Sequence, residues 1–226
     1  GNFGGTLTIA GISTLNAAYG NFGPIPWYAM AAQRHMDLYG TTQDQLGQIP
    51  VSTRAWARKS PHATKTEPLD LDGYHASRWI VEPFHVLDCC LVSNGAVAAI
   101  VTRADRARDL AQPPAYIHGM GQAHNIDPAG ATDSAIHTPA RQAGETAFAM
   151  AGASAKDVTC AELYDCYSYT VLASLEDYGF CKKGEGGEYV SNGTIELGGK
   201  RPNNTSGGHL CEGYTHGMSC LLYTSD

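Results

Sequence analysis

Apolar residues recur every three or four positions in several stretches of the chain, which is the spacing of one helix face. Residues 27–38 have this spacing, and Gly40 follows as a stop signal. Residues 41–60 form a second predicted helix, with Thr42 as N-cap and Gln45 three residues later in the capping-box position. Pro50 lies inside it and should kink the helix or divide it in two. Further helices are predicted over residues 104–112, 138–151 and 168–180.

Shorter apolar runs between these helices predict strands. Residues 96–102, AVAAIVT, form a continuous apolar run typical of a fully buried strand. Strands are also expected near residues 115–122 and 159–164. Residues 60–83 have little periodicity and are expected to cross the surface or a partner, whereas the glycine-rich residues 181–208 predict loops with short hairpins. Alternating strands and helices indicate an α/β fold, in which sites commonly follow strands.

Charge and composition divide the chain and narrow its function. The junction near Gln112 separates residues 1–113 from residues 114–226. The first half carries nine basic and nine acidic residues, and the second carries six and thirteen, within a net charge of −7. Without a basic stripe, nucleic acid is not expected as a partner. No apolar run is long enough to predict a membrane span.

The cysteines predict reduced thiols rather than disulfides or metal ligands. The chain has seven, an odd number at irregular spacing, and no CxxC pair. No metal site is therefore predicted, and a cytoplasmic protein is the simplest interpretation. Cys166 and Cys211 stand beside acidic residues, which raise a thiol pKa, so structural roles are favoured over nucleophilic ones.

Two segments are dense in chemically capable side chains: ELYDCYSYT (residues 162–170) and NTSGGHLCEGYTHG (residues 204–217). They follow predicted strands, so they could converge on one pocket or stay apart. His209 and His216 are open between acid–base and hydrogen-bonding or phosphate-facing roles. Tyr164 and Tyr214 are weaker candidates from residue type alone, because tyrosine is an infrequent acid–base group.

The order of these motifs resembles the thiolase superfamily, and specifically its sterol-carrier and lipid-transfer-protein branch. The resemblance covers about Tyr19 to Ser219 and includes YAMAAQRHMDLYG, SRWIVEPFHVLDCC and the two segments above. It implies a layered α/β/α/β/α fold, here expected to be incomplete at both ends. In a typical thiolase, an Asn-Glu-Ala-Phe loop and a Gly-His-Pro loop surround the nucleophilic cysteine. Aligning those loops with YDCY and GYTHG places Tyr164 at the asparagine and Tyr214 at the histidine.

This double replacement resembles a sub-branch of steroid side-chain retro-aldolases. The resemblance implies cleavage of a β-hydroxyacyl-CoA, with Tyr164 and Tyr214 as catalytic residues and no cofactor beyond the CoA thioester substrate. Asp165, Glu212 and His216 are expected to orient or polarise the phenols. The remaining predicted contribution is stabilisation of the enolate oxygen by backbone N–H groups, which are those of Gly207, Gly208 and Gly213.

The family also implies partners and alternatives. Acyl-CoA, a second copy bound through the thiolase core, and a small OB-fold and zinc-ribbon protein are the expected partners. The alternatives are thiolytic or condensing acyl transfer, and a non-catalytic acyl-CoA or lipid carrier. The last residues, CLLYTSD, do not resemble the family and are expected to be an artefact of sequencing read-through. The 226-residue piece alone is expected to be inactive, because the family's cysteine positions on both sides are missing from it.

Overall fold

The computed structural model describes residues 17–21, 23–124, 136–218 and 221. Helices predominate in these parts of the chain, and several short segments connect them. The α-helices are α2 (Ile25–Tyr39), α3 (Gln43–Ala57), α4 (Leu71–Ala76), α5 (Ala104–Ala107), α6 (Ala140–Ala151), α7 (Ser168–Asp177) and α8 (Gly186–Ser191). Strands β1 (Trp79–Val81) and β2 (Phe84–His85) and the single turns η1 (Val86–Asp88), η3 (Ala155–Asp157) and η4 (Gly208–Glu212) complete the elements. None of the described helices combines the length and apolar character needed to cross a bilayer.

The first two long helices have the boundaries that their end signals predict. Gly40 ends α2 in a left-handed conformation, with φ 74°, and its N–H donates to Met36 O. Thr42 caps α3, and Gln45 completes the reciprocal capping box. Pro50 lies inside α3 and does not divide the helix in two. The alternative expectation, that Pro50 kinks the helix, stays a prediction. The helices predicted over residues 104–112, 138–151 and 168–180 correspond to α5, α6 and α7.

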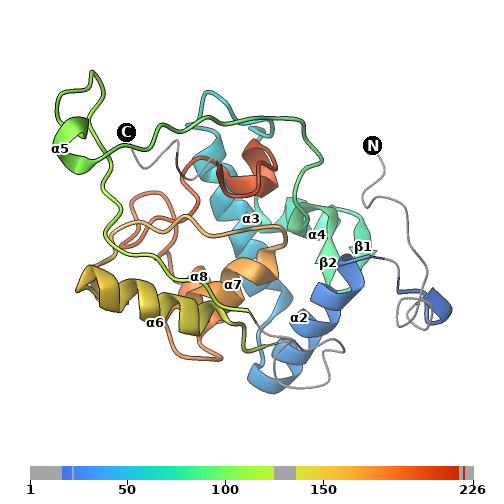
Figure 1. Cartoon of the computed structure of the whole chain (residues 1–226). Coiled ribbons are helices and arrows are strands. Elements are labelled where there is room, and N and C mark those ends of the chain that lie inside the picture. The colour runs from blue at the N-terminus through green and yellow to red at the C-terminus, as the bar shows by residue number, and fades with distance from the viewer. Residues whose placement is uncertain (1–16, 22, 125–135, 219–220, 222–226) are drawn as a thin grey trace.

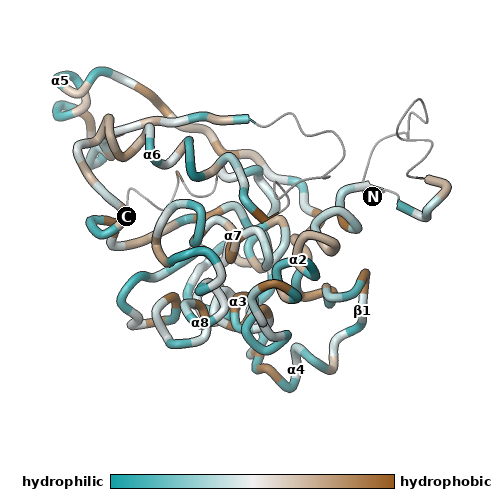
Figure 2. The backbone as a smooth tube through the Cα atoms, turned by 90° about the horizontal axis from the view of Figure 1, so that it is seen from below, coloured by the Kyte–Doolittle hydropathy of each residue, from teal (hydrophilic) through white to brown (hydrophobic). Residues whose placement is uncertain are grey.

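Helix α3 is the centre of the molecule. It contacts α4, α7, α8 and the one-turn π-helix η4, as Figure 1 shows. The largest core side chains come from these elements and from α2 and β2, and Phe84 stacks on Tyr167 with ring centroids 5.4 Å apart. Figure 2 shows the same grouping from below, with α5 standing at the far edge. Because α3 touches both α7 and η4, it links the two segments that carry the candidate site.

Two segments for which no helix was predicted contain short helices. Residues 60–83 include α4, capped by the Asp70 side chain through Gly73 N–H at 2.8 Å, and β1, which pairs with β2 directly after the segment. Tyr74 is fully buried and anchors this segment, but most of its residues are exposed, so it crosses the surface as expected. In residues 181–208 the described structure has helix α8 instead of hairpins.

The strand predictions were wrong in this structure. Antiparallel β1 and β2, with Trp79 opposite His85 and Val81 opposite Phe84, form the sheet of the described residues. Residues 96–102 and 115–122 have no strand, and only an isolated parallel bridge between Ala161 and Asn203 remains of the third. A buried strand needs hydrogen-bonding neighbours on its edges, and no described segment supplies them to these runs. Ile100 and Ile117 are accordingly 92% and 71% exposed.

Candidate functional site

The two motif segments meet at a pair of phenols. Tyr164 lies between the Ala161–Asn203 bridge and α7, and Tyr214 lies two residues after η4. Their hydroxyl oxygens are hydrogen-bonded to each other, and their ring centroids are 6.0 Å apart at an interplanar angle of 62°. The expected convergence of the two segments is therefore confirmed. The catalytic roles of these tyrosines stay a prediction.

The Tyr164 segment is fixed on both sides of the tyrosine. Leu163 N–H donates to Asn204 Oδ1 at 2.7 Å, which joins the two motifs directly. On the other side, Thr170 Oγ1 donates to Tyr164 O at 2.9 Å from the first turn of α7. These bonds hold the backbone while the phenol ring, with the residue 40% exposed, reaches toward solvent. A substrate can therefore approach Tyr164 without unfolding the segment.

The Tyr214 segment is held by contacts from distant parts of the chain. Tyr214 N–H donates to Ser93 Oγ at 2.6 Å. One turn earlier, Cys211 O accepts the N–H groups of Thr64 and Lys65 at 3.0 and 2.9 Å. Ser93 lies in a turn that the sequence places only before a predicted strand, so its role was missed. No periodic or compositional signal could have identified this contact.

Asp165 supports the loop that precedes Tyr214 rather than touching the phenols. Its carboxylate accepts the backbone N–H groups of His209 and Leu210 at 2.8 and 3.2 Å, and it is 1% exposed. His209 Nδ1 also lies 2.9 Å from Asp165 Oδ1. Asp165 therefore acts on the phenol pair through η4, one step further away than expected.

The other two predicted supporting residues differ in their relation to Tyr214. His216 is exposed, with φ 52°, and its ring lies 4.4 Å from the Tyr214 ring. The Glu212 carboxylate has a buried Oε2 without a hydrogen-bond partner, while its backbone oxygen accepts from Thr64 Oγ1 at 2.6 Å. His216 is thus beside a phenol, whereas the known contact of Glu212 is a structural one.

The three glycines predicted to stabilise an oxyanion donate their N–H groups inside the loop. Gly207 N–H donates to Asn204 O, Gly208 N–H to Ser206 Oγ and Gly213 N–H to Gly208 O. Gly207 and Gly208 have φ of 105° and 54°, a region that favours glycine. A Cβ at Gly208 would lie 2.1 Å from Asp165 Oδ2. These glycines shape the tight loop, and their role toward an enolate stays a prediction.

Burial and pairing determine the acidity of the two phenols. Desolvation raises the pKa of Tyr164, and its hydrogen bond to Tyr214 raises it further. Desolvation also raises the pKa of Tyr214, and the hydrogen bond from Tyr164 offsets part of that rise. Both phenols are therefore protonated near pH 7. Within the pair, the hydrogen bond makes Tyr164 hold its proton more tightly and Tyr214 less tightly.

The described cysteines have the properties of structural thiols. Burial raises the pKa of Cys166 to about 11 and also raises the pKa of Cys211. Cys211 Sγ accepts from Arg54 Nε at 3.2 Å, a contact that anchors η4 to α3. None of the cysteines in the described residues has a lowered pKa, which a nucleophile requires. The interpretation of Cys166 and Cys211 as structural agrees with these shifts.

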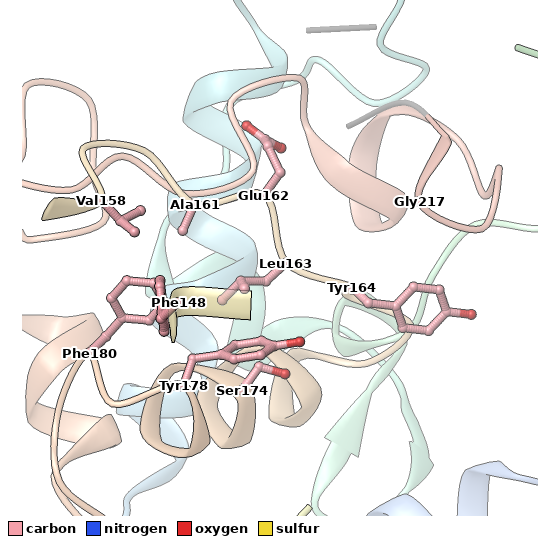
Figure 3. A pocket seen from close by; sticks show the side chains of 10 residues that line it. All are labelled: Phe148, Val158, Ala161, Glu162, Leu163, Tyr164, Ser174, Tyr178, Phe180 and Gly217. Carbon is pink, nitrogen blue, oxygen red and sulfur yellow. The ribbon is translucent and has the colours of Figure 1, made fainter. Parts of the chain in front are cut away.

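A cavity of about 460 Å³ lies behind Tyr164, between α6 and α7. Figure 3 shows that the hydroxyls of Ser174 and Tyr178 lie close to its apolar lining, whereas the Tyr164 phenol points away from the other lining side chains. The cavity and the phenol pair therefore share a backbone segment but open in different directions. No group of three or more His, Cys, Asp or Glu side chains in the described residues is placed to hold a metal ion.

Known proteins of the thiolase superfamily are similar to this chain. Residues 121–224 match the family model described as "Thiolase C-terminal domain-like". The chain is 40% identical over 202 residues to a steroid side-chain-cleaving aldolase of Thermomonospora curvata, covering 87% of this chain and 52% of the relative. It is 39% identical over 204 residues to the 17-hydroxy-3-oxo-4-pregnene-20-carboxyl-CoA lyase of Mycobacterium tuberculosis, with the same coverage. The chain thus spans about half the length of the curated relatives it matches.

Solved structures agree with these relatives. The structure titled "Ltp2-ChsH2(DUF35) aldolase" superimposes with a TM-score of 0.83 at 34% identity, covering 96% of this chain and 59% of that chain. A monomeric SCP2-thiolase-like protein of Mycobacterium smegmatis has a TM-score of 0.66 at 16% identity, covering 90% and 45%, and supports the fold alone. The predicted α/β class is therefore confirmed at the level of the fold, although this structure has little regular sheet. The chain is thus similar to the thiolase superfamily, in the branch related to sterol carrier protein 2.

Proposed function

We propose that the complete protein is a lyase that splits a β-hydroxyacyl-CoA, of the steroid side-chain type, by a retro-aldol reaction. The observation that carries this proposal is the direct hydrogen bond between Tyr164 and Tyr214. A relay between two phenols suits a reaction that moves one proton from an oxygen to a carbon. The similarity to a steroid side-chain-cleaving aldolase and to a CoA lyase supports the same reaction class.

The phenol pair can move that proton without forming a lasting phenolate. Tyr214 takes the proton of the β-hydroxyl group as it passes on its own, while the carbon–oxygen bond becomes the carbonyl of a ketone. The bond between the α and β carbons breaks, and its electrons form the thioester enolate. Tyr214 gives its own proton to Tyr164, which protonates the α carbon and releases a shorter acyl-CoA. Each phenol ends protonated, which agrees with the raised pKa of both.

The test is the substitution Tyr214→Phe in the complete protein. It removes the acceptor oxygen but keeps the ring, so we expect kcat to fall by about 10²- to 10⁴-fold, with little change in KM. Release of ketone and acyl-CoA from a β-hydroxyacyl-CoA is the measurement. Tyr116→Phe, at an exposed tyrosine outside the site, is the matched control. Cleavage by Tyr214→Phe at close to the unmodified rate would overturn the tyrosine mechanism.

Acyl transfer is the second candidate, because the chain is also 33% identical to an acetyl-CoA acetyltransferase of Methanothermobacter thermautotrophicus. That chemistry needs a nucleophilic cysteine, and burial raises the pKa of Cys166 and Cys211. Trapping of an acyl-cysteine after incubation with radiolabelled acetyl-CoA would favour acyl transfer.

A third candidate is a non-catalytic carrier, which similarity to sterol carrier protein 2 at 27% identity motivates. It predicts saturable acyl-CoA binding without any turnover.

We also propose two protein partners: a second copy of the protein, and a small protein with an OB-fold and a zinc ribbon. The structural relative titled Ltp2-ChsH2 aldolase names two components, which supports a two-protein enzyme. Co-expression followed by size-exclusion chromatography with light scattering tests both partners. The free thiols of Cys89, Cys90, Cys160, Cys166, Cys181 and Cys211 support a reducing, cytoplasmic setting.

A further inference from the structure

The imidazole of His209 lies against both phenols of the candidate site. Its ring centroid is 4.9 Å from that of Tyr164 at 65°, and 4.9 Å from that of Tyr214 at 66°. Both contacts are edge-to-face arrangements, which aromatic rings favour. His209 is 1% exposed, whereas Tyr164 is 40% exposed. Both phenol rings therefore pack against one buried imidazole ring.

Polar contacts on two edges fix the imidazole itself. Nε2 accepts the N–H of Gly217 at 3.0 Å, so this nitrogen carries no proton. In the neutral ring the proton is then on Nδ1, which lies 2.9 Å from Asp165 Oδ1. This second contact is not aligned as a hydrogen bond, and we treat it as an electrostatic contact between the carboxylate and the Nδ1–H group. Asp165 belongs to the segment that carries Tyr164 and Gly217 to the segment that carries Tyr214, so the ring joins both motifs.

A simple packing role does not account for this arrangement. A core histidine needs only satisfied nitrogens, but His209 also separates two phenols whose oxygens are hydrogen-bonded. Moving the ring would change the spacing of both phenols together.

We propose that His209 is a positioning residue: its ring, held by Asp165 and Gly217, sets the two tyrosines at the spacing that lets their oxygens share a proton. Its consequence for catalysis rests on the retro-aldol function proposed above. The structural part does not, because the pairing of the phenols can be measured without a substrate.

The experiment is carbon NMR of the 226-residue chain labelled with [¹³Cζ]tyrosine, which reports the ionisation of each phenol. Tyr164→Phe and Tyr214→Phe assign the two resonances. In the unmodified chain we expect a coupled titration, with two steps above pH 10 that belong to the pair. His209→Leu should uncouple the phenols, so the two steps should move closer together and the upper step, which belongs mainly to Tyr164, should fall by about one pH unit or more. His62→Ala, at an exposed histidine, should leave the titration unchanged.

The Leu variant should fold, because Asp165 keeps its two backbone donors and Gly217 is partly exposed to water. His209→Asn is the second variant: it keeps a polar side chain near Asp165 but removes the ring, so it should uncouple the phenols as well. A coupled titration that persists in either folded variant would overturn the inference. In the complete protein, His209→Leu should lower kcat at least tenfold at constant KM. If His209→Leu uncouples the phenols but the unmodified complete protein cleaves no substrate, the proposed function is overturned and the positioning role stands.

Discussion

The polar loop at residues 204–211 is buried, whereas the apolar run at residues 96–102 is exposed. In the loop, Asn204, Ser206 and His209 are each 1% exposed. In the apolar run, Ile100 and Val101 are 92% and 82% exposed. Polarity therefore does not decide which of these segments enters the core of this structure.

The difference lies in hydrogen-bonding partners. The loop can be buried because Asn204 accepts Leu163 N–H and Asp165 accepts two amides of η4. Burying these groups without partners would cost several kcal/mol each. The apolar run has no such provision, since no strand of the described residues pairs with its backbone. A segment enters a protein interior at low cost when most of its backbone and polar groups find partners there.

The largest effect should come from removing the carboxylate on which the buried loop depends. Asp165→Ala leaves the amides of His209 and Leu210 without acceptors, so we expect a loss of about 3–5 kcal/mol in the free energy of unfolding. Urea denaturation measures this loss. Asp105→Ala, which removes an exposed carboxylate paired with Arg103, is the control and should barely move the midpoint. A midpoint for Asp165→Ala equal to that of the control would show that the loop does not need this acceptor.

Adding a methyl group to the loop should be nearly as damaging. Gly208→Ala combines a left-handed φ of 54° with a Cβ only 2.1 Å from Asp165 Oδ2, so we expect a loss of about 3 kcal/mol. Gly193→Ala has a similar φ of 85° but nothing within 4 Å of its Cβ. It should cost only the backbone strain, about 1 kcal/mol. Equal losses for the two variants, measured by thermal unfolding, would mean that the contact with Asp165 is relieved easily.

Buried polar groups remain sensitive to pH even when they are well partnered. Burial raises the pKa of Asp88 from 3.8 to about 6, although Ser168, Tyr74 and His85 donate to it. The folded protein therefore holds a proton that the unfolded chain releases at lower pH. Stability should be greatest below pH 4 with respect to this group and should fall by roughly 2–3 kcal/mol as the pH rises to about 6.

The variant Asp88→Asn tests this dependence, because an amide cannot ionise. The slope of unfolding free energy against pH between 4 and 6 should become flatter in the variant than in the unmodified chain. Denaturant titrations at a series of pH values supply the slope. Identical slopes in the two proteins would show that Asp88 has the same pKa in the folded and unfolded chains.

The smallest effect should come from the apolar run. Ile100→Ser places a polar side chain where the isoleucine is already in water, so the change should be below about 0.5 kcal/mol. Ile49→Ser, at a fully buried isoleucine of α3, should cost about 4 kcal/mol by comparison. A loss of 2 kcal/mol or more for Ile100→Ser would show that residues 96–102 are buried, as the apolar pattern predicts.

The sequence predicted the features that depend on neighbouring residues. The ends of α2 and α3 follow from Gly40, Thr42 and Gln45, whose end signals act within one helical turn. Helices α6 and α7 follow from apolar spacing. The family was recognisable from the order of the motifs. The division at residue 113 also rests on local signals in the sequence, and it stays a prediction.

Contacts between distant residues were beyond the sequence, because each depends on where the chain folds back. The predicted strands failed for this reason, since a strand exists only through a partner that spacing cannot name. The residues CLLYTSD lie, except for Leu221, outside the described residues, so their expected origin is untested. The contacts of Ser93 and His209 with Tyr214 could not be predicted from the sequence for the same reason. Ser93 accepts the Tyr214 N–H from a distant part of the chain, and the His209 ring packs against the Tyr214 ring.

The sequence by itself determined the longer helices and the resemblance to the thiolase superfamily, which aligns Tyr164 and Tyr214 with a thiolase's asparagine and histidine. Those are properties of residue type and order, which do not change with the path of the chain. Tertiary structure alone decided that the two phenols share a hydrogen bond, that His209 lies beneath both, and that a polar loop is buried while an apolar run is not. The physical reason is that burial and acidity depend on which groups are available as partners in space.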